Sequence, residues 1–263
     1  MITNDVLVEW QQKTPWASWG QIEQDLIITR AIVEIFNDEY LAENLVFRGG
    51  TALHKLYLTP AMRYSEDIDL VQSVEGPIGP IFDRLRVALS FLGEARKTVR
   101  KSASNKMIFR VDATMPPITA LKLKIEMNSV EGDSVFGYEH LPFELDTRWF
   151  TGECIVTTYS LDELLGTKLR ALYQRKKGRD LFDLWAALQS GEVDSLRVVK
   201  AFRYYASTPD KAYPSSEELL ENLILKMEDE GFIGDVDALI RNGVDYNPKD
   251  AFELVCAQLL SKV

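Results

Sequence analysis

Two neighbouring stretches of the sequence decide the fold: LVFRGGTALHK (residues 45–55) and YSEDIDLV (residues 64–71). The first is a short apolar run that ends in two glycines, which is typical of a buried strand entering a tight turn. The turn leads into a predicted helix, which Thr51 can cap. The second stretch alternates acidic and apolar residues from Asp67 onward, which predicts a strand with one polar side.

The second predicted strand carries two acidic residues, Asp67 and Asp69, on the same side. Residues two apart on a strand point the same way, so the two carboxylates lie a few ångströms apart. They repel each other unless a cation lies between them. Mg²⁺ prefers a few carboxylates together with substrate phosphates. We therefore predict a metal site at Asp67 and Asp69; the alternative is an Asp-x-Asp on an ordinary surface strand.

The turn formed by Gly49, Gly50 and Thr51 is a candidate phosphate-binding site. Glycines let backbone N–H groups approach phosphate oxygens, and a helix that begins there adds free N–H donors and the positive end of its dipole. Thr51 adds a hydroxyl that can donate to a phosphate. For the turn alone, an ordinary strand-to-helix connection is the alternative. The order of the two motifs favours a phosphate site beside a metal site.

A later stretch, ALKLKIEMN (residues 120–128), has the clearest strand pattern in the chain, with polar and apolar residues on opposite faces. Glu126 lies on its polar face and is a candidate third catalytic carboxylate. It could take the proton from an attacking hydroxyl or complete a second metal site. The alternative is a structural glutamate that pairs with Lys124 or Lys122 on the same face.

Two predicted helices of the second half carry a charged group that contains Lys168, Arg175, Asp180 and Asp183. Lys168 and Arg175 lie within two helical turns and can share a face. There they could neutralise the charge of a triphosphate and of its leaving group. Asp180 could orient either of the two cations. The alternative is a salt-bridged pair of surface helices.

The pattern divides the chain into two domains, residues 1–155 with both helices and strands and residues 156–263 with helices alone. A helix is predicted over about residues 19–37 in the first domain, and another over residues 235–241 in the second. Ser160 and Glu163 have the spacing of a capping box at the first helix of the second domain.

Composition narrows the functional class. The net charge of the 263 residues is −10, which argues against a broad electrostatic grip on nucleic acid. Two local basic clusters nevertheless suit a focal phosphate ligand, although solvated helix faces are the alternative. The clusters are Arg96, Lys97, Arg100, Lys101 and Lys106, and Lys168, Arg170, Arg175, Lys176, Lys177 and Arg179.

Targeting signals are not evident in the sequence. The first residues lack the basic and apolar regions of a signal peptide, and no apolar stretch approaches the roughly 18 residues that a membrane span needs. The two cysteines, Cys154 and Cys256, are far apart and lack a metal-ligand spacing. We therefore expect a cytoplasmic protein that has no membrane partner.

These motifs, taken in order, resemble those of the AbiEii-type nucleotidyltransferase-like toxins, a family that includes the MenT toxins. FRGGTALHK (residues 47–55) followed by RYSEDIDL (residues 63–70) is similar to the opening motif of the family, and KLRALYQRKKGRDLFDL (residues 168–184) is similar to its second signature. The resemblance implies an α+β fold. A DNA polymerase β-like core with a mixed sheet and helices would be followed by an all-helical C-terminal domain.

The resemblance also implies a function. It implies Mg²⁺, a nucleoside triphosphate as substrate, and a toxin of a bacterial toxin–antitoxin or phage-defence abortive-infection system with an antitoxin encoded nearby. Some members add nucleotides to the 3′ end of tRNA, so tRNA is the expected acceptor. By position, phosphate would be held by Gly50 and Thr51, metal by Asp67 and Asp69, and the nucleotide by Lys168, with Asp180 also in the active site. Many members have serine where this chain has Thr51.

Three other hypotheses for the function stay open. A nucleotidyltransferase with the same site could modify a protein or a small molecule. A non-catalytic module on the same fold could bind a nucleotide or an antitoxin without turnover. A kinase-type phosphotransferase would use the same groups but attack a different phosphate of the triphosphate.

Overall fold

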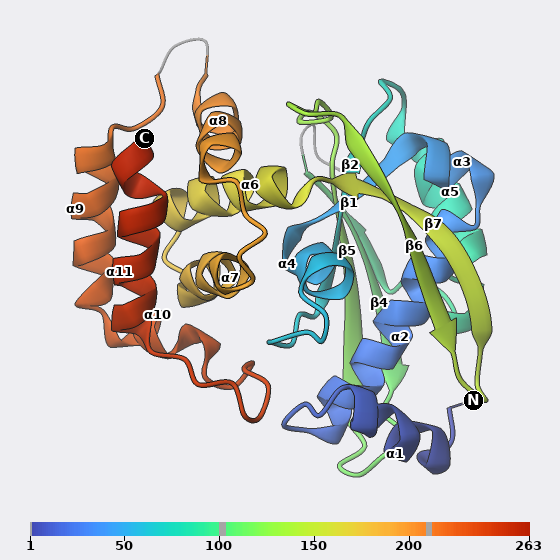
Figure 1. Ribbon diagram of the computed structural model, residues 1–263. Helices are drawn as coiled ribbons and strands as arrows, with labels where there is room; N and C mark the ends of the chain where they lie inside the picture. The colour runs from blue at the N-terminus through green and yellow to red at the C-terminus, as the bar shows by residue number, and fades with distance from the viewer. Residues whose placement is uncertain (1, 100–103, 209–211) are drawn as a thin grey trace. The chain divides into compact units, whose positions relative to one another are not determined.

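The computed structural model describes residues 2–99, 104–208 and 212–263, which form two compact units (Figure 1). The first unit comprises Met1–Asp133 and Tyr138–Tyr159, and the second comprises Ser134–Gly137 and Ser160–Val263. The predicted boundary between residues 155 and 156 lies inside the last strand of the first unit, β7 (Thr151–Tyr159), and the units divide after that strand. Two residues of the first basic cluster, Arg100 and Lys101, lie outside the described residues.

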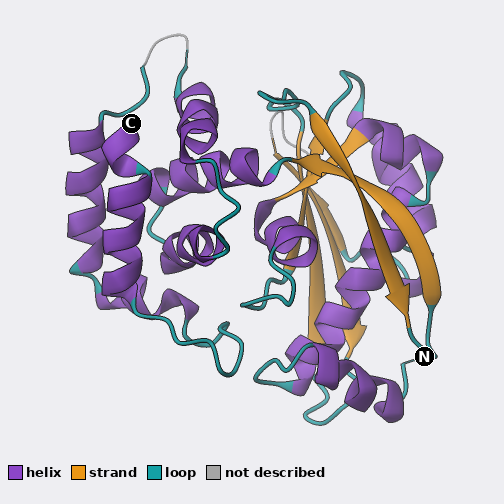
Figure 2. Ribbon diagram, viewed as in Figure 1, coloured by secondary structure: helices purple, strands orange, loops and turns teal. Residues whose placement is uncertain are grey.

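The first unit is built on a mixed sheet, drawn in orange in Figure 2. Its described residues form seven strands in the order β3-β4-β5-β2-β1-β7-β6. Strand β2 is parallel to β5, and β1 is parallel to β7, whereas the other neighbours are antiparallel. The strands are β1 (Leu45–Arg48), β2 (Asp67–Gln72), β3 (Lys97–Val99), β4 (Ser104–Asp112), β5 (Ala120–Asn128), β6 (Tyr138–Asp146) and β7. The mixed sheet and its helices confirm the predicted fold class.

Helix α2 (Trp19–Phe36) provides most of the helical packing on this sheet. A capping box between Ser18 and Gln21 begins the helix, and its apolar side chains pack against β2, β5, β6 and β7. Burial of such side chains stabilises the unit by about 1.5–3 kcal/mol each. The other helical segments of the unit are α1 (Asn4–Lys13), α3 (Glu39–Asn44), α4 (Gly49–Ala52), the π-helical turn η1 (Leu53–Tyr57), α5 (Ile78–Ala88) and η2 (Ser90–Leu92).

The regular elements of the second unit are all helical within its described residues, and α6 lies at its centre (Figure 1). Helices α7, α8 and α9 pack against α6, and α11 packs against α7. The segments are α6 (Leu161–Gln174), α7 (Gly178–Gln189), α8 (Ser195–Ala206), α9 (Ser216–Met227), α10 (Glu230–Ile233), η3 (Gly234–Val236), α11 (Pro248–Gln258) and η4 (Leu260–Lys262).

Three local predictions are wrong. The predicted helix over residues 235–241 is a 3-10 turn, η3, that ends at Val236. Ser160 precedes α6, but its side chain accepts no capping hydrogen bond, and the Glu163 carboxylate binds Ser134 and Val135. Thr51 does not cap a helix, since α4 already begins at Gly49.

The hydrogen bonds of Glu163 join the Ser134–Gly137 segment to the helices of the second unit. Its carboxylate accepts from the Ser134 hydroxyl at 2.8 Å, the backbone N–H of Val135 at 2.7 Å and the Tyr205 hydroxyl at 2.6 Å. Glu163 has no exposed surface, so these donors satisfy a fully buried charge. This carboxylate is therefore part of the core of the unit.

Candidate active site

The candidate residues form two groups, one in each unit. The group in the first unit comprises Gly49, Gly50, Thr51, Asp67, Asp69 and Glu126, and the group in the second unit comprises Lys168, Arg175, Asp180 and Asp183.

The register of β1 and β2 brings Gly49 against Asp69. Arg48 and Asp69 are paired across the two antiparallel strands, and the chain turns directly afterwards at Gly49 with φ of +82°. A Cβ atom on Gly49 would lie 2.2 Å from Asp69 Oδ2. Glycine is therefore required here for its backbone conformation and for the space that the carboxylate occupies. The glycine turn and the acidic strand consequently meet at one point.

Gly50 and Thr51 follow Gly49 in α4 and lie against the segment that leads into β2. A Cβ atom on Gly50 would lie 2.5 Å from Nη2 of Arg63, whose side chain is buried. Thr51 is 1% exposed; its hydroxyl donates to the carbonyl oxygen of Asp67, and its oxygen lies 2.9 Å from Ser65 Oγ. The Thr51 hydroxyl thus ties α4 to the start of β2, and its proton is already donated within the protein.

Strand β5 pairs with β2 on one side and with β4 on the other, and these pairings bring the acidic residues beside two lysines. Asp67 is paired with Lys124 and Asp69 with Glu126. Lys124 Nζ lies 2.6 Å from Asp67 Oδ2 and 2.8 Å from Glu126 Oε1. Lys106, on β4, places its Nζ 2.9 Å from the same Glu126 oxygen. The pairing of Glu126 with Lys124 is the alternative that the sequence left open, and Lys106 is a second partner that the sequence did not indicate.

These contacts set the protonation of the group. Burial raises the pKa of Asp67 to about 6, and the neighbouring Asp69 adds to the shift, although Lys124 opposes it. For Glu126, burial acts in the same direction, but hydrogen bonds from Lys124 and Lys106 outweigh it and lower the pKa. Burial also disfavours the charged form of Lys124, yet its bonds to Asp67 and Glu126 raise its pKa. Lys124 therefore stays a cation.

The chemistry of this group fits a metal ion that takes only a few ligands from the protein. Within the parts of the chain that the structure describes, no three or more His, Cys, Asp or Glu side chains are placed to hold a metal ion. Two carboxylates on one strand are enough for Mg²⁺, because substrate phosphates and water complete its coordination. The ion pair with Lys124 also shows that Asp67 already binds a positive charge.

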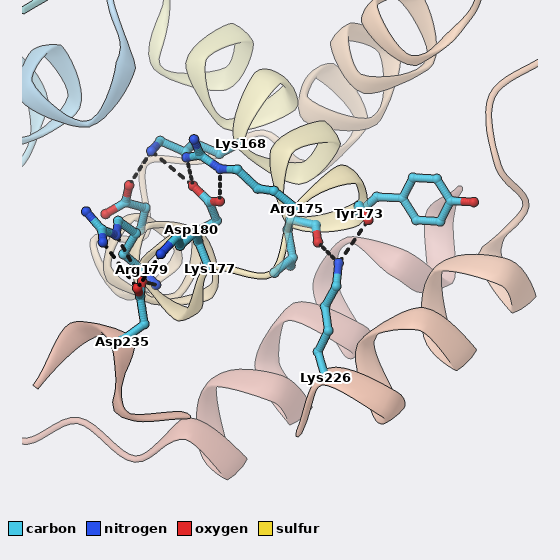
Figure 3. A network of polar contacts seen from close by, with 10 residues as sticks. Lys168, Tyr173, Arg175, Lys177, Arg179, Asp180, Lys226 and Asp235 are labelled. Atoms are coloured by element: carbon cyan, nitrogen blue, oxygen red, sulfur yellow. Dashed lines mark hydrogen bonds and ion pairs between the residues drawn. The ribbon is translucent and has the colours of Figure 1, made fainter. Parts of the chain in front are cut away.

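The second group is a compact network between α6 and α7 (Figure 3). Lys168 Nζ lies 2.7 Å from Asp183 Oδ2 and 3.3 Å from Asp180 Oδ1. Arg175 binds Asp180 through two bonds, with Nε 2.6 Å from Oδ2 and Nη2 2.7 Å from Oδ1. Both aspartates are fully buried, and Lys168 is 6% exposed. Two cations thus face two anions, so the network is close to neutral.

Most of the second basic cluster is paired in the same way. Both Lys177 and Arg179 bind Asp235 (Figure 3). Lys176 binds Asp229. These ion pairs join the start of α7 to the segments around α10 and η3. The charge that the sequence places in this cluster is therefore largely compensated, which leaves less of it for a phosphate ligand.

Lys226 was not a candidate, yet it belongs to the same region. Its Nζ donates to the backbone carbonyls of Leu172 and Tyr173 near the end of α6 (Figure 3). Burial lowers the pKa of Lys226 to about 8. Bonding to the last carbonyls of a helix satisfies acceptors that have no partner within the helix. Lys226 consequently links α9 to α6.

Lys124 and Arg63 contact the first group, although the sequence patterns assigned neither of them a role in the site. Lys124 was named only as a structural partner of Glu126, although its position two residues earlier on the same face was visible in the strand pattern. Its contact with Asp67 depends on the parallel pairing of β5 with β2, which no local pattern reveals. Arg63 belongs to the quoted motif, but its burial beneath Gly50 is a tertiary feature.

Comparison with known proteins finds a match to one protein family and to several solved structures. The family model described as "Nucleotidyl transferase AbiEii toxin, Type IV TA system" matches residues 30–257. A search of curated proteins finds no match. Helical segments long and apolar enough for a membrane span do not occur among the described residues.

Solved structures share the fold at low sequence identity. The MenT4 nucleotidyltransferase toxin of Mycobacterium tuberculosis H37Rv matches with a TM-score of 0.67 and 16% identity, over 100% of this chain and 91% of that one. JHP933 of Helicobacter pylori matches with a TM-score of 0.55 and 18% identity, over 93% of each chain. Identities this low show the fold alone.

Proposed function

Because this chain belongs to the AbiEii family of nucleotidyl transferase toxins of type IV toxin–antitoxin systems, we propose that it transfers nucleotides from a nucleoside triphosphate to the 3′ end of tRNA. Nucleotidyl transfer is the activity of the family, and an antitoxin is the partner that such a system implies. The metal, the acceptor and the roles of individual residues are our proposals.

The contact between Gly49 and Asp69 is the observation that carries the proposal. It joins a glycine turn, whose backbone N–H groups can bind phosphate, to a strand that carries two carboxylates. A triphosphate held at Gly49 and Gly50 would have its phosphates within reach of a cation at Asp67 and Asp69. At the other glycines with positive φ, a Cβ would meet nothing within 4 Å; these are Gly93, Gly137, Gly191 and Gly243.

Asp67 and Asp69 would hold Mg²⁺. The ion would supply charge neutralisation at the phosphate under attack and at the acceptor hydroxyl. Gly49 and Gly50 would hold the outer phosphates through backbone N–H groups, and Thr51 would hold Asp67 in place through its bond to the carbonyl oxygen. A direct bond from Thr51 to phosphate would require its hydroxyl to release that oxygen.

Glu126 fits a supporting role in this site better than that of a proton acceptor. Its two lysine partners lower its pKa, and a carboxylate stabilised as an anion is a weak base. In the second unit, Lys168 would contact the nucleotide and Arg175 would assist it. Asp180 would hold both cations in position, as its bonds to them support.

The test is incubation of the protein with each α-labelled nucleoside triphosphate and total RNA, followed by sequencing of the labelled RNA. Label on tRNA 3′ ends that disappears with EDTA and in Asp69→Asn is the expected result. Asp112→Asn is the matched control, because Asp112 is an exposed strand aspartate at the end of β4. Undiminished transfer by Asp69→Asn would overturn the assignment of the metal site.

The same assay separates the other readings. Transfer of label to protein or to small hydroxyl compounds would replace tRNA as the acceptor, and transfer from γ-labelled but not α-labelled nucleotide would indicate a kinase-type reaction. Nucleotide binding without any turnover would indicate a binding module. A cytoplasmic location, where nucleoside triphosphates and tRNA are present, is part of the proposal.

A further inference from the structure

Lys124 lies between two carboxylates that belong to different strands. Its Nζ is 2.6 Å from Asp67 on β2 and 2.8 Å from Glu126 on its own strand. Both distances are those of charge-assisted hydrogen bonds. The parallel register pairs Asp67 directly with Lys124, so the two residues lie side by side on neighbouring strands. One ammonium group therefore neutralises a carboxylate of the proposed metal pair.

A divalent cation at Asp67 would compete with this ammonium group. Mg²⁺ binds carboxylate oxygens at about 2.0–2.1 Å, which would bring it close to an ammonium held 2.6 Å from the same carboxylate. Two cations at such short separation repel each other strongly in a partly buried site. The Asp67 oxygen that binds Lys124 therefore cannot keep that bond while a metal ion fully occupies the same oxygen.

Glu126 gives the displaced ammonium a second partner. Lys124 already contacts Glu126 at 2.8 Å, and the flexible four-carbon stem of lysine allows it to leave Asp67 without leaving Glu126. Lys106 also binds Glu126, so this carboxylate keeps a cation in either state. Asp67 has no such second lysine within the ion pairs that the structure describes.

We propose that Lys124 is the built-in counter-ion of the metal site: it neutralises Asp67 when the metal is absent and moves to Glu126 alone when a divalent cation binds. The inference rests on the proposed metal role of Asp67 and Asp69. It makes Lys124 a positioning residue that sets the affinity of the site for metal, and it gives Glu126 the task of holding Lys124.

Metal binding in the absence of nucleotide tests this directly. The probe is Mn²⁺, titrated into the full-length protein and its variants, with free Mn²⁺ measured by electron paramagnetic resonance. Lys124→Met removes the ammonium and keeps the apolar stem. Because an adjacent cation shifts the proton affinity of a carboxylate by about 1–3 pKa units, we expect Lys124→Met to lower the Kd for Mn²⁺ by roughly ten-fold or more.

Lys122→Met is the matched control. Lys122 lies two residues earlier on the same face of β5 and is exposed, so its removal changes the net charge by the same amount. We expect the Kd for Mn²⁺ to change by no more than about two-fold in this variant, because exposed charges that are not in contact are largely screened. Lys124→Gln is a second variant that keeps a polar side chain, and we expect it to behave like Lys124→Met.

A second readout is thermal unfolding with and without Mn²⁺. In EDTA, Lys124→Met should unfold at a lower temperature than the wild type, because Asp67 loses its partner. Mn²⁺ should then raise the unfolding temperature of Lys124→Met by more than it raises that of the wild type. If the wild type binds Mn²⁺ through Asp69 but Lys124→Met binds it equally or more weakly, the counter-ion role is refuted while the metal site stands. If neither protein binds Mn²⁺, the proposed metal site itself fails, and the inference fails with it.

Discussion

Gly49→Ala tests the contact on which the site depends. Glycine at this position has φ of +82°, a conformation that costs an alanine about 1–2 kcal/mol. The added Cβ would also lie 2.2 Å from Asp69 Oδ2, whereas ordinary contact begins near 3.4 Å. The carboxylate must therefore move by roughly 1 Å, a displacement that costs an enzyme about 100-fold in rate when it affects a catalytic group.

Gly191→Ala separates the two effects. Gly191 also has a positive φ, +75°, but a Cβ there would meet nothing within 4 Å. In urea unfolding, Gly191→Ala should lose about 1–2 kcal/mol of stability, and Gly49→Ala should lose more, because its clash with Asp69 adds to the cost of the backbone conformation. In the assay with α-labelled nucleotide and RNA, only Gly49→Ala should lose about 100-fold in initial rate, which corresponds to about 2.7 kcal/mol. A normal rate in Gly49→Ala, or an equal loss of rate in Gly191→Ala, would show that the contact with Gly49 does not position the Asp69 carboxylate for catalysis.

Three further predictions concern stability. Gly50→Ala places a Cβ 2.5 Å from Arg63 Nη2, so urea unfolding should show a loss of about 1–3 kcal/mol; no loss would mean that Arg63 moves freely. Glu163→Ala leaves the Tyr205 hydroxyl and two backbone N–H groups without their acceptor, which should cost more than about 3 kcal/mol by the same measurement, and a smaller loss would point to replacement by water. Burial alone would raise the pKa of Asp235, but its hydrogen bonds, chiefly from Arg179, lower that pKa to about 2. The contribution of this carboxylate to folding stability should therefore be complete above pH 4 and lost between about pH 4 and pH 2. Acid unfolding of Asp235→Asn should not show this loss.

Local patterns in the sequence predicted the elements that carry one strong periodicity. The strand over residues 120–128 and the long helix α2 were predicted because burial of one face imposes a regular alternation of apolar residues. Strands β6 and β7 were not predicted. Many of their residues are exposed or half-buried, so the hydrophobic alternation that identifies a strand is weak, and the pairing of the two strands stabilises them instead.

In the candidate site, too, some features follow from local sequence patterns and others depend on tertiary contacts. Local patterns were enough to identify the family motifs, the acidic pair and the glycine turn, because residues two apart on a strand share a face and positive φ favours glycine. Two contacts became evident in the folded chain alone: Asp69 occupies the space of the missing Gly49 side chain, and Lys124 binds Asp67. Those contacts follow from the register of strands that are distant in the chain, and register depends on packing of the whole sheet rather than on any local pattern.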